Sequence, residues 1–535
     1  MDSDVTASPD PLRPARTRAH PLGEVADRAG TTLDAAGMAV SPHAGTPVTG
    51  VTLDSRRICP GDLYAALPGA NVHGARFAEQ AQAAGAVAVL TDPAGAAQIA
   101  SETSASIPVL VVPEPRSVLG DLASWVYGDP SHHLAVIGIT GTNGKTTTAY
   151  LMDAALRAVG HTTGLIGTVE TRVAGRAVPS ARTTPEAPDL QALFARMLEE
   201  GVTAAVIEVS SHSLVLHRVD GTRFAVSAFT NLSQDHLDFH GSLEDYYAAK
   251  SMLFDGRAAR DVVVVDDEWG RRLVRPTTTT VSTRDDVAAA WRASDVRDSP
   301  TGVSFTLAGP GLAARRVALQ IPGVFNAANA ALAIAALAGI GVDPEGAVRG
   351  VESLPAIPGR VERVDAGQDY LAVVDYAHTP DAVASLLGAL GPVTTGRMIT
   401  VLGCGGDRDP DKRPLMGEAA ARGSDLVIVT DDNPRSEPPE SIRAAVLAGA
   451  RSAAAEVGSQ VREVANRSVA IREAVAQARP GDAVVIAGKG HEQGQEVAGT
   501  VHPFDDRREL RAAICAALDL PEPAGSHPTD EEQSP

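Results

Sequence analysis

The sequence predicts an α/β protein of three domains: a central domain with a P-loop-type, mainly parallel sheet, flanked by an N-terminal α/β domain and a C-terminal Rossmann-like domain. The first reason is length, because a chain of 535 residues exceeds what one hydrophobic core organises. The second is that short apolar runs rich in β-branched residues alternate with helical patterns, as in doubly wound sheets. The third is a pair of proline-containing breaks, near residues 130 and 355.

The N-terminal domain is expected over residues 21–132. Residues 50–69 read as a strand, a turn at Pro60-Gly61-Asp62 and a second strand, and residues 77–90 read as a helix followed by a strand. Residues 1–20 are polar and proline-rich, so we expect a disordered tail there.

The central domain, residues 133–356, is organised around the segment 134–160. An apolar run is followed by GTNGKTT and then by apolar residues spaced for one face of a helix. Strand, glycine turn and helix in this order present backbone N–H groups and the positive end of a helix dipole to a phosphate. Lys145 is expected to reach the β- and γ-phosphates, and the Thr146 hydroxyl to face Mg²⁺. The phosphate loop comprises Gly141, Thr142, Asn143, Gly144, Lys145, Thr146 and Thr147.

Two further strands of the central domain end in residues that suit a metal ion. Glu208 ends the run 202–209, and His236 follows the run 224–230. Because ligands bind at the carboxyl ends of parallel strands, both side chains are expected beside the phosphate loop, where they would serve Mg²⁺. The alternative is a zinc site of His236, Asp238 and His240, or histidines that are merely satisfied within a loop.

Lysine is rare in this chain, which makes each lysine informative. Of 46 basic residues only four are lysines, so 46 − 4 = 42 are arginines. Lys250 lies in YYAAKSMLF, a helical segment with a buried aromatic face. A partly desolvated lysine near a metal has a lowered pKa and can exist as a free amine. We therefore expect a chemical role for Lys250, the alternative being a surface lysine whose stem covers apolar residues.

The C-terminal domain, residues 357–520, carries three motifs at strand ends. Strands are expected at 370–375, 398–402, 425–430 and 483–487. The segments 403–408 (GCGGDR), 431–435 (DDNPR) and 488–492 (GKGHE) follow three of them. Together they define a pocket that mixes arginine with carboxylates, which suits a zwitterionic amino acid. The acidic segment 521–535 is expected to be a second disordered tail.

Composition narrows the function further. A net charge of −20 argues against non-specific binding to nucleic acids. The chain has no apolar run of the roughly 18 residues that a membrane helix needs, so no membrane insertion is expected. Three widely spaced cysteines without metal-ligand spacing indicate a reducing compartment. We expect a cytoplasmic protein.

Taken together, these motifs resemble the Mur ligase family, ATP-dependent enzymes that build the peptide stem of bacterial peptidoglycan. The resemblance covers residues 45–510 and rests on TGTNGKTTT, EVSSH, NLSQDHLDFHG, DYAHTPD, GCGGDRD, DDNPR and GKGHE. It implies one domain for the UDP part of the substrate, a central ATPase and a domain for the incoming amino acid. The last three motifs resemble the branch that adds the third residue, and the DNPR form resembles the type that adds meso-2,6-diaminopimelate.

The resemblance also implies roles for individual residues. Lys145, Lys250, Glu208 and His236 would be catalytic. Lys250 would carry a carbamate derived from CO₂, and it would hold two Mg²⁺ ions together with Thr146, Glu208 and His236. Beyond the phosphate loop, ATP would contact Asn326, Arg360 and Asp375. The UDP-N-acetylmuramoyl dipeptide would contact Leu53, Ser55, Thr183, Thr184, Ser210 and Arg218. The amino acid would contact Arg408, Asp432, Asn433, Pro434, Arg435, Gly488 and Glu492.

The implied reaction activates the D-glutamyl carboxylate of the dipeptide with ATP and then joins it to diaminopimelate through an acyl-phosphate intermediate. A monomer is expected. Arg182 and Leu216 depart from the family pattern, which commonly has asparagine and glutamine at these positions. Two alternatives remain open: an L-lysine-adding ligase of the same family, and a P-loop protein that hydrolyses nucleotide to switch or move a partner.

Overall fold

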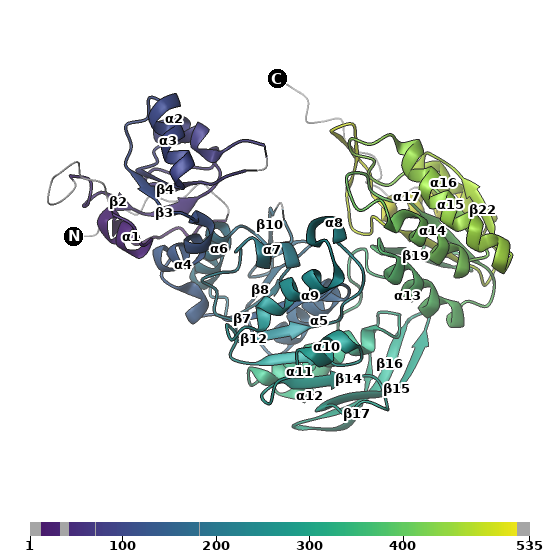
Figure 1. Cartoon of the computed structure of the whole chain (residues 1–535). Coiled ribbons are helices and arrows are strands. Elements are labelled where there is room, and N and C mark those ends of the chain that lie inside the picture. Colours follow the sequence, from purple (N-terminus) through teal and green to yellow (C-terminus); the bar gives the residue numbers. More distant parts are fainter. Residues whose placement is uncertain (1–11, 33–41, 70, 181, 522–535) are drawn as a thin grey trace.

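The computed structural model describes residues 12–32, 42–69, 71–180 and 182–521. The chain forms three lobes in sequence order, with the central lobe between the N-terminal and C-terminal ones (Figure 1). Each lobe contains a mainly parallel sheet with helices packed on it, which confirms the predicted α/β class. None of the helices in these ranges has the length and apolar run needed to cross a membrane.

The N-terminal lobe has a four-stranded parallel sheet in the order β3-β4-β5-β6, with a small antiparallel pair, β1 and β2, beside it. Its elements are β1 His20–Pro21, α1 Leu22–Arg28, β2 Pro47–Val48, β3 Gly50–Thr52, β4 Asp62–Ala66, α2 Ala78–Ala83, β5 Ala88–Thr91, α3 Pro93–Glu102, β6 Val109–Val111 and α4 Pro115–Val126. Every residue of β3, β4 and β5 is buried, as expected for a sheet covered on both faces.

The central lobe is built on an eleven-stranded sheet in the order β10-β9-β8-β11-β7-β12-β13-β14-β15-β16-β17. The strands are β7 Ala135–Thr140, β8 Thr163–Ile166, β9 Thr171–Val173, β10 Arg176–Val178, β11 Ala204–Glu208, β12 Val226–Phe229, β13 Asp261–Val264, β14 Thr279–Ser282, β15 Trp291–Ser299, β16 Gly302–Gly309 and β17 Leu312–Ala318. The seven middle strands, β8 to β15 in this order, are parallel. β7 lies inside this group, so the phosphate loop emerges near the middle of the sheet.

Helices cover both faces of the central sheet. They are α5 Lys145–Ala158, α6 Ala187–Glu199, α7 Ser211–Val215, α8 Leu237–His240, α9 Leu243–Ser251, α10 Glu268–Arg272, α11 Asn326–Gly339 and α12 Pro344–Glu352. Helices α5, α11 and α12 share one hydrophobic core with the sheet, whereas α6 and α9 belong to the core on the other face. The alanine-rich α11 is buried over most of its length, which explains why its sequence is apolar on nearly all sides.

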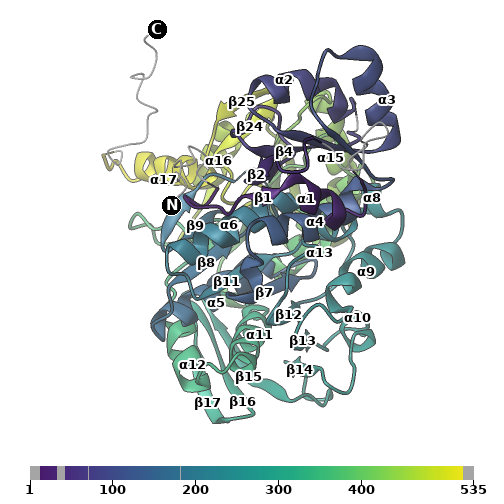
Figure 2. The same ribbon diagram turned by 90° about the vertical axis from the view of Figure 1, so that its left-hand side faces the viewer.

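The antiparallel extension β15–β17 was not among the predicted elements. These strands lie at the end of the molecule opposite the N-terminal lobe (Figure 2). Trp291, Phe305 and Val317 belong to the core that contains α11, while the residues that alternate with the buried ones are half-buried or exposed. Only one face of these antiparallel strands is buried, so apolar and polar residues alternate along them. This alternation is a weaker sign of a strand in the sequence than the continuous apolar runs of the parallel strands.

The C-terminal lobe contains a six-stranded sheet in the order β18-β19-β23-β20-β21-β22, parallel except for β18. Its elements are β18 Glu362–Arg363, β19 Leu371–Asp375, α13 Pro380–Leu390, β20 Met398–Leu402, α14 Lys412–Arg422, β21 Leu426–Val429, α15 Pro439–Val457, β22 Gln460–Glu463, α16 Arg467–Gln477, β23 Ala483–Ala487, β24 Gly494–Val497, β25 Thr500–Pro503 and α17 Asp506–Ala517. β20 and β23 are adjacent, so the segments that follow them leave the same edge of the sheet.

The predicted N-terminal tail needs correction where the structure describes it. Leu12 is buried in the core of the central lobe, and Arg13 forms two hydrogen bonds of 2.6 and 2.8 Å with buried Asp62 of the N-terminal lobe. The backbone N–H groups of Ala15 and Arg16 donate to the Glu199 carboxylate. Specific contacts therefore fix the start of this segment, through Asp62 and Glu199, and its end, where His20 pairs with Val48. The tail predictions for residues 1–11 and 522–535 lie outside the described residues.

We predict that Arg467→Met loosens the C-terminal sheet. Arg467 and Asp506 are both fully buried and are joined by two hydrogen bonds of 2.7 Å. Removing one partner leaves a buried charge without compensation, which costs about 3–5 kcal/mol. Hydrogen exchange of the amides in β21 and β23 should accelerate accordingly. The exposed pair Arg422–Glu418 supplies a control, because Arg422→Met should leave exchange unchanged. Equal exchange in wild type and Arg467→Met would contradict the prediction.

Candidate active site

The phosphate loop has the geometry that the sequence predicts. Gly141 and Gly144 adopt φ angles of 144° and 87°, which residues with a Cβ atom rarely adopt. A Cβ atom at Gly141 would lie 1.9 Å from Thr230 Oγ1, and one at Gly144 would lie 2.4 Å from Asn329 Oδ1. The loop is therefore packed so closely against its neighbours that glycine is required at both positions.

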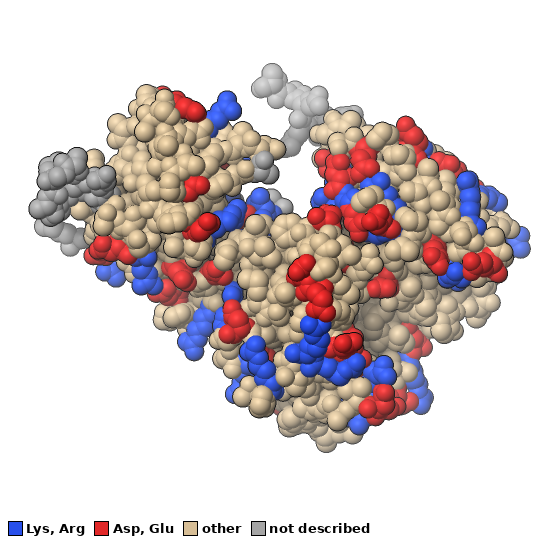
Figure 3. Space-filling model, in the orientation of Figure 1, with Lys and Arg blue, Asp and Glu red and all other residues tan. Residues whose placement is uncertain are grey.

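A cleft of about 700 Å³ lies between the central and C-terminal lobes. The phosphate loop from Thr142 to Thr147, the ends of β11 and β12, and the start of α11 line it on one side. Arg360 and the segment from Asp375 to His378 line it on the other. The space-filling view shows the molecule hollowed between its N-terminal and C-terminal lobes, with acidic and basic side chains interspersed over this face (Figure 3).

The Thr146 hydroxyl joins three segments inside this cleft. It donates to Glu208 Oε2 at 3.0 Å and accepts from Arg360 Nη2 at 3.0 Å. Glu208, buried at the tip of β11, also accepts from the backbone N–H and the hydroxyl of Thr168. The predicted neighbours Thr146, Glu208 and Arg360 are thus in direct contact, and Thr168 is a contributor that the sequence analysis missed.

Lys145 and Lys250 converge on one carbonyl group. Lys145 Nζ donates to Gly141 O at 2.9 Å and to Thr142 O at 2.8 Å, and Lys250 Nζ donates to Gly141 O at 2.8 Å. Burial lowers the pKa of Lys145. Burial, reinforced by the neighbouring Lys145 ammonium, holds the pKa of Lys250 well below its usual value. Lys250 also lies over the Tyr246 ring and does not line the cleft itself.

Asp235 is a second acidic group of the cleft that the sequence analysis did not select. This buried carboxylate lies 3.3 Å from His236, 3.9 Å from His378 and 4.0 Å from Lys412. The last two belong to the C-terminal lobe, so Asp235 faces a histidine and a lysine from across the cleft. Burial lowers the pKa of His236 to about 3, which keeps its imidazole neutral with a nitrogen lone pair free to bind a cation.

The donor set fits Mg²⁺ better than zinc. Thr146 and Glu208 present a hydroxyl and a carboxylate 3.0 Å apart beside the phosphate loop, and hard oxygen donors are what Mg²⁺ prefers. Within the described ranges, no group of three or more His, Cys, Asp or Glu residues is arranged to hold a metal. The zinc alternative of His236, Asp238 and His240 therefore has no support from the geometry.

The residues expected near adenosine and the phosphates are placed around the same cleft. Asn326 begins α11, and its side-chain amide bonds Pro322 O and Asn329. Both carboxylate oxygens of Asp375 accept backbone N–H groups, from Val361 and Ala377, at 2.7 Å. Asp375 thus fixes the backbone next to Arg360 and so orients that guanidinium toward the loop.

The residues expected to bind the UDP-linked dipeptide fall into two groups. Thr183 and Ser210 line the cleft, and the hydroxyl of buried Thr184 bonds Glu208 O and Ser210. Arg218 follows α7, does not line the cleft and pairs with Glu186 at 2.9 Å. Leu53 and Ser55 follow β3 in the N-terminal lobe, outside the cleft lining. A substrate contacting both groups must therefore span two lobes.

The motifs of the C-terminal lobe come together as predicted from their strand ends. Asn433 Nδ2 donates to Glu492 Oε2 at 2.8 Å, and Arg435 Nη1 donates to Gly406 O at 2.6 Å. A Cβ atom at Gly488 would lie 2.6 Å from Asp432 Oδ2, so these segments touch. Pro434 is buried between Asn433 and Arg435, whereas Arg408 is exposed and donates to Asp407 O.

Lys489, which was not among the predicted site residues, sits at the centre of this network. It is fully buried, and its Nζ donates to Asn433 Oδ1 and to Glu492 Oε2, both at 2.9 Å. Asn433 Oδ1 also accepts from the Glu496 N–H, so the orientation of its amide is fully determined. The rarity of lysine in the sequence was the signal that could have identified it.

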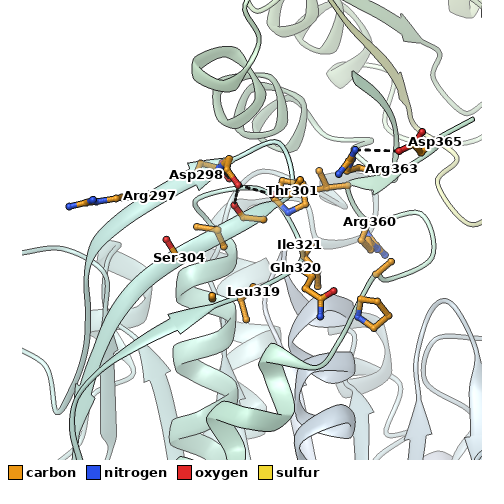
Figure 4. Close-up of a pocket in the computed structure, with 18 residues that line it drawn as sticks. Arg297, Asp298, Thr301, Ser304, Leu319, Gln320, Ile321, Arg360, Arg363 and Asp365 are labelled. Carbon is orange, nitrogen blue, oxygen red and sulfur yellow. Dashed lines mark hydrogen bonds and ion pairs between the residues drawn. The ribbon is translucent and has the colours of Figure 1, made fainter. Parts of the chain in front are cut away.

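A second hollow of about 770 Å³ lies between the β15–β16 hairpin and the segment joining the two lobes (Figure 4). Arg360 and Val361 line both this hollow and the cleft. Arg363 and Asp365 form an ion pair at its edge. The joining segment therefore borders both spaces, and Arg360 and Val361 are held there by Thr146 and Asp375.

Comparison with known proteins agrees with this geometry. Residues 47–127 match the description "Mur ligase family, catalytic domain", residues 139–337 "Mur ligase middle domain" and residues 359–490 "Mur ligase, glutamate ligase domain". The chain belongs to the Mur ligase family.

Individual relatives are similar over nearly the whole chain. The UDP-N-acetylmuramoyl-L-alanyl-D-glutamate--2,6-diaminopimelate ligase of Streptomyces coelicolor is 52% identical over 95% of this chain and 98% of its own length. The ligase of the same name from Corynebacterium glutamicum is 52% identical over 88% of this chain and 92% of its own. A solved structure of a ligase with that name superposes with a TM-score of 0.63 and 32% identity, covering 94% of this chain and 100% of that one.

We predict that Lys145→Met weakens ATP binding without unfolding the protein. The Lys145 ammonium donates to two loop carbonyls, and a phosphate would replace those carbonyls as its partner. The dissociation constant for ATP with Mg²⁺ should rise at least about tenfold, because a charge-assisted contact is lost. Calorimetric titration measures this, and Arg349→Met, on the exposed side of α12, is the matched control. Unchanged affinity in Lys145→Met would refute the assignment.

Proposed function

We propose that this chain is an ATP-dependent ligase that joins meso-2,6-diaminopimelate to UDP-N-acetylmuramoyl-L-alanyl-D-glutamate in peptidoglycan synthesis. The observation that carries the proposal is the pairing of two pockets. The phosphate loop lines one side of the interlobe cleft, and the Asn433–Glu492 network lies at the corresponding strand ends of the C-terminal lobe. A cavity of about 440 Å³ borders both regions, since Thr168 and Thr183 also line the cleft and Glu492 belongs to the network.

The first step transfers a phosphoryl group. An oxygen of the D-glutamyl γ-carboxylate attacks the γ-phosphorus of ATP, the bond to the β,γ-bridging oxygen breaks, and ADP leaves. Both reactants are anions, so the repulsion between them is the main obstacle. Lys145 and Arg360 provide cationic groups beside the loop, and Thr183, Thr184 and Ser210 position the substrate. Mg²⁺ held by Thr146, Glu208 and His236 would neutralise phosphate charge.

The second step forms the amide. The neutral amine of diaminopimelate attacks the acyl carbon, the acyl–phosphate bond breaks, inorganic phosphate leaves, and the amine proton passes to solvent or phosphate. The Asn433–Glu492–Lys489 network offers a carboxylate to an ammonium group, and Arg435, beside it, offers a guanidinium to a carboxylate. Holding the two reactants together makes the bimolecular attack effectively unimolecular.

We propose that the Lys250 amine is carbamylated by CO₂. Two ammonium groups compete for Gly141 O, and burial favours the neutral amine that CO₂ requires. Addition of CO₂ releases one proton and gives an anion. The interaction between the Lys145 ammonium and the group on Lys250 then changes from repulsion to attraction. The carbamate also gives Lys250 oxygen atoms, which are the ligands that Mg²⁺ prefers.

Phosphate release is the direct test of the proposed function. Wild-type protein with ATP and the UDP-linked dipeptide should release phosphate rapidly with diaminopimelate, slowly with L-lysine and hardly at all with neither. Arg435→Ala should lower the rate with diaminopimelate by about ten- to hundredfold, because a charge-assisted contact is lost. Phosphate release independent of both substrates would favour a P-loop switch or motor. A preference for L-lysine would favour the other ligase branch.

We predict that Lys250→Arg abolishes turnover. Arginine keeps a cation at this position but cannot form a carbamate, so the rate should fall at least ~100-fold, as when a preorganised charge is removed. After equilibration with ¹³CO₂, NMR should show a carbamate carbon in wild type and in Lys412→Arg but not in Lys250→Arg. A fully active Lys250→Arg variant would disprove the carbamate.

A further inference from the structure

Lys489 is a fully buried cation in the middle of the Asn433–Glu492 network. It follows β23, and none of its side chain is exposed. Its Nζ donates to Asn433 Oδ1 and to Glu492 Oε2, both at 2.9 Å, and lies 4.0 Å from Asp432 Oδ1. A buried charge is stable only where groups of opposite character compensate it, and here two motifs supply them. Because it is covered on all sides, Lys489 affects a substrate only through these neighbours.

The hydrogen bonds of Lys489 distinguish the two carboxylate oxygens of Glu492. Oε2 accepts from Lys489 Nζ at 2.9 Å and from Asn433 Nδ2 at 2.8 Å. Within the described part of the chain Oε1 accepts no hydrogen bond, and the side chain is 31% exposed. Asn433 Oδ1 accepts from Lys489 and from the Glu496 N–H, so its amide cannot turn over without losing both bonds. Lys489 thus fixes which oxygen of Glu492 is occupied and which is free.

The free oxygen belongs to a side chain at the border between two lobes. Glu492 lines the cavity of about 440 Å³ from the C-terminal lobe, and Thr168 and Thr183 line it from the central lobe. The carboxylates of Asp432 and Glu492 face the single ammonium of Lys489, so this trio keeps an excess of one negative charge. One further ammonium group is the complement of that charge.

We propose that Lys489 is a positioning residue for the incoming amino acid, because it holds Glu492 Oε2 so that Oε1 receives the ammonium group that does not react. The inference rests on the proposed function and deepens it. Diaminopimelate and L-lysine each carry two amino groups, of which one attacks the acyl carbon and the other stays protonated. Lys489 therefore serves the recognition of the second ammonium group, which both amino acids share, and not that of the second carboxylate.

Steady-state kinetics of Lys489→Met test this role, since methionine keeps an apolar stem and removes the ammonium. The Michaelis constant for diaminopimelate should rise about tenfold, because Glu492 loses a charge-assisted partner. The kcat at saturating diaminopimelate should fall far less, and the Michaelis constants for ATP and the UDP-linked dipeptide should stay unchanged. With L-lysine, kcat/KM should fall by the same factor as with diaminopimelate. Arg462→Met, an exposed arginine of β22 paired with Glu473, is the matched control.

A double variant tests whether Lys489 acts through Glu492. Glu492→Gln alone should raise the Michaelis constant for diaminopimelate, and adding Lys489→Met should raise it no further. A single turnover of ATP and the dipeptide without amino acid should yield the same ADP in wild type and Lys489→Met, which shows that the fold and the first step are intact.

Three results would overturn the role of Lys489: an unchanged Michaelis constant for diaminopimelate in Lys489→Met, loss of the single-turnover ADP, or effects that multiply in the double variant. A loss confined to diaminopimelate would also overturn it, because the second carboxylate would then be the group recognised. Absence of amide formation by the wild-type protein would instead overturn the proposed function.

Discussion

The site depends on the two hydrogen bonds of the Thr146 hydroxyl, because they join segments that are far apart in the sequence. The hydroxyl donates to Glu208 at the tip of β11 and accepts from Arg360 in the segment that leads to the C-terminal lobe. Both carboxylate oxygens of Asp375 in turn hold backbone groups of the C-terminal lobe, one of them next to Arg360. The phosphate loop, a neighbouring strand end and the interlobe connection are thus coupled through one hydroxyl. A ligand that draws Thr146 away from Arg360 would also release one constraint on the position of the C-terminal lobe.

Much of this arrangement could be predicted from the sequence, because buried parallel strands and glycine turns leave strong local patterns. The run before Gly141 predicts β7, and the run ending at Glu208 predicts β11. The adjacency of the segments after β20, β21 and β23 follows from the rule that parallel strands end at one edge. The contacts of Thr168 with Glu208 and of Asp235 with His378 and Lys412 could not be predicted, because they join segments tens of residues apart. The ordered segment from Leu12 to His20 was missed for the same reason, since Asp62 and Glu199 fix it from two different lobes.

Side chains of like charge lie close together at two places, a pair of lysines and a group of arginines. The two places differ in whether the side chains can lose their charge. Lys145 and Lys250 share the Gly141 carbonyl, and burial lowers the pKa of Lys250, which favours its free amine. Arg116, Arg182 and Arg218 share Glu186, and guanidinium groups stay charged under all ordinary conditions. A crowded lysine can relieve repulsion by losing its proton, whereas a crowded arginine keeps its charge and depends on a carboxylate such as Glu186. The choice of residue type therefore distinguishes a position suited to covalent chemistry from one that stays charged.

The distribution of lysine has a practical consequence. Lys145 lines the cleft, and Lys250, Lys412 and Lys489 are 1%, 8% and 0% exposed, while arginines carry the cationic surface of this chain. Acylating reagents that modify lysines over the outside of most proteins would meet here one side-chain amine that lines the cleft, that of Lys145, while the other three are buried. The extent of labelling at Lys145 would then report on occupancy of the cleft rather than on general surface exposure.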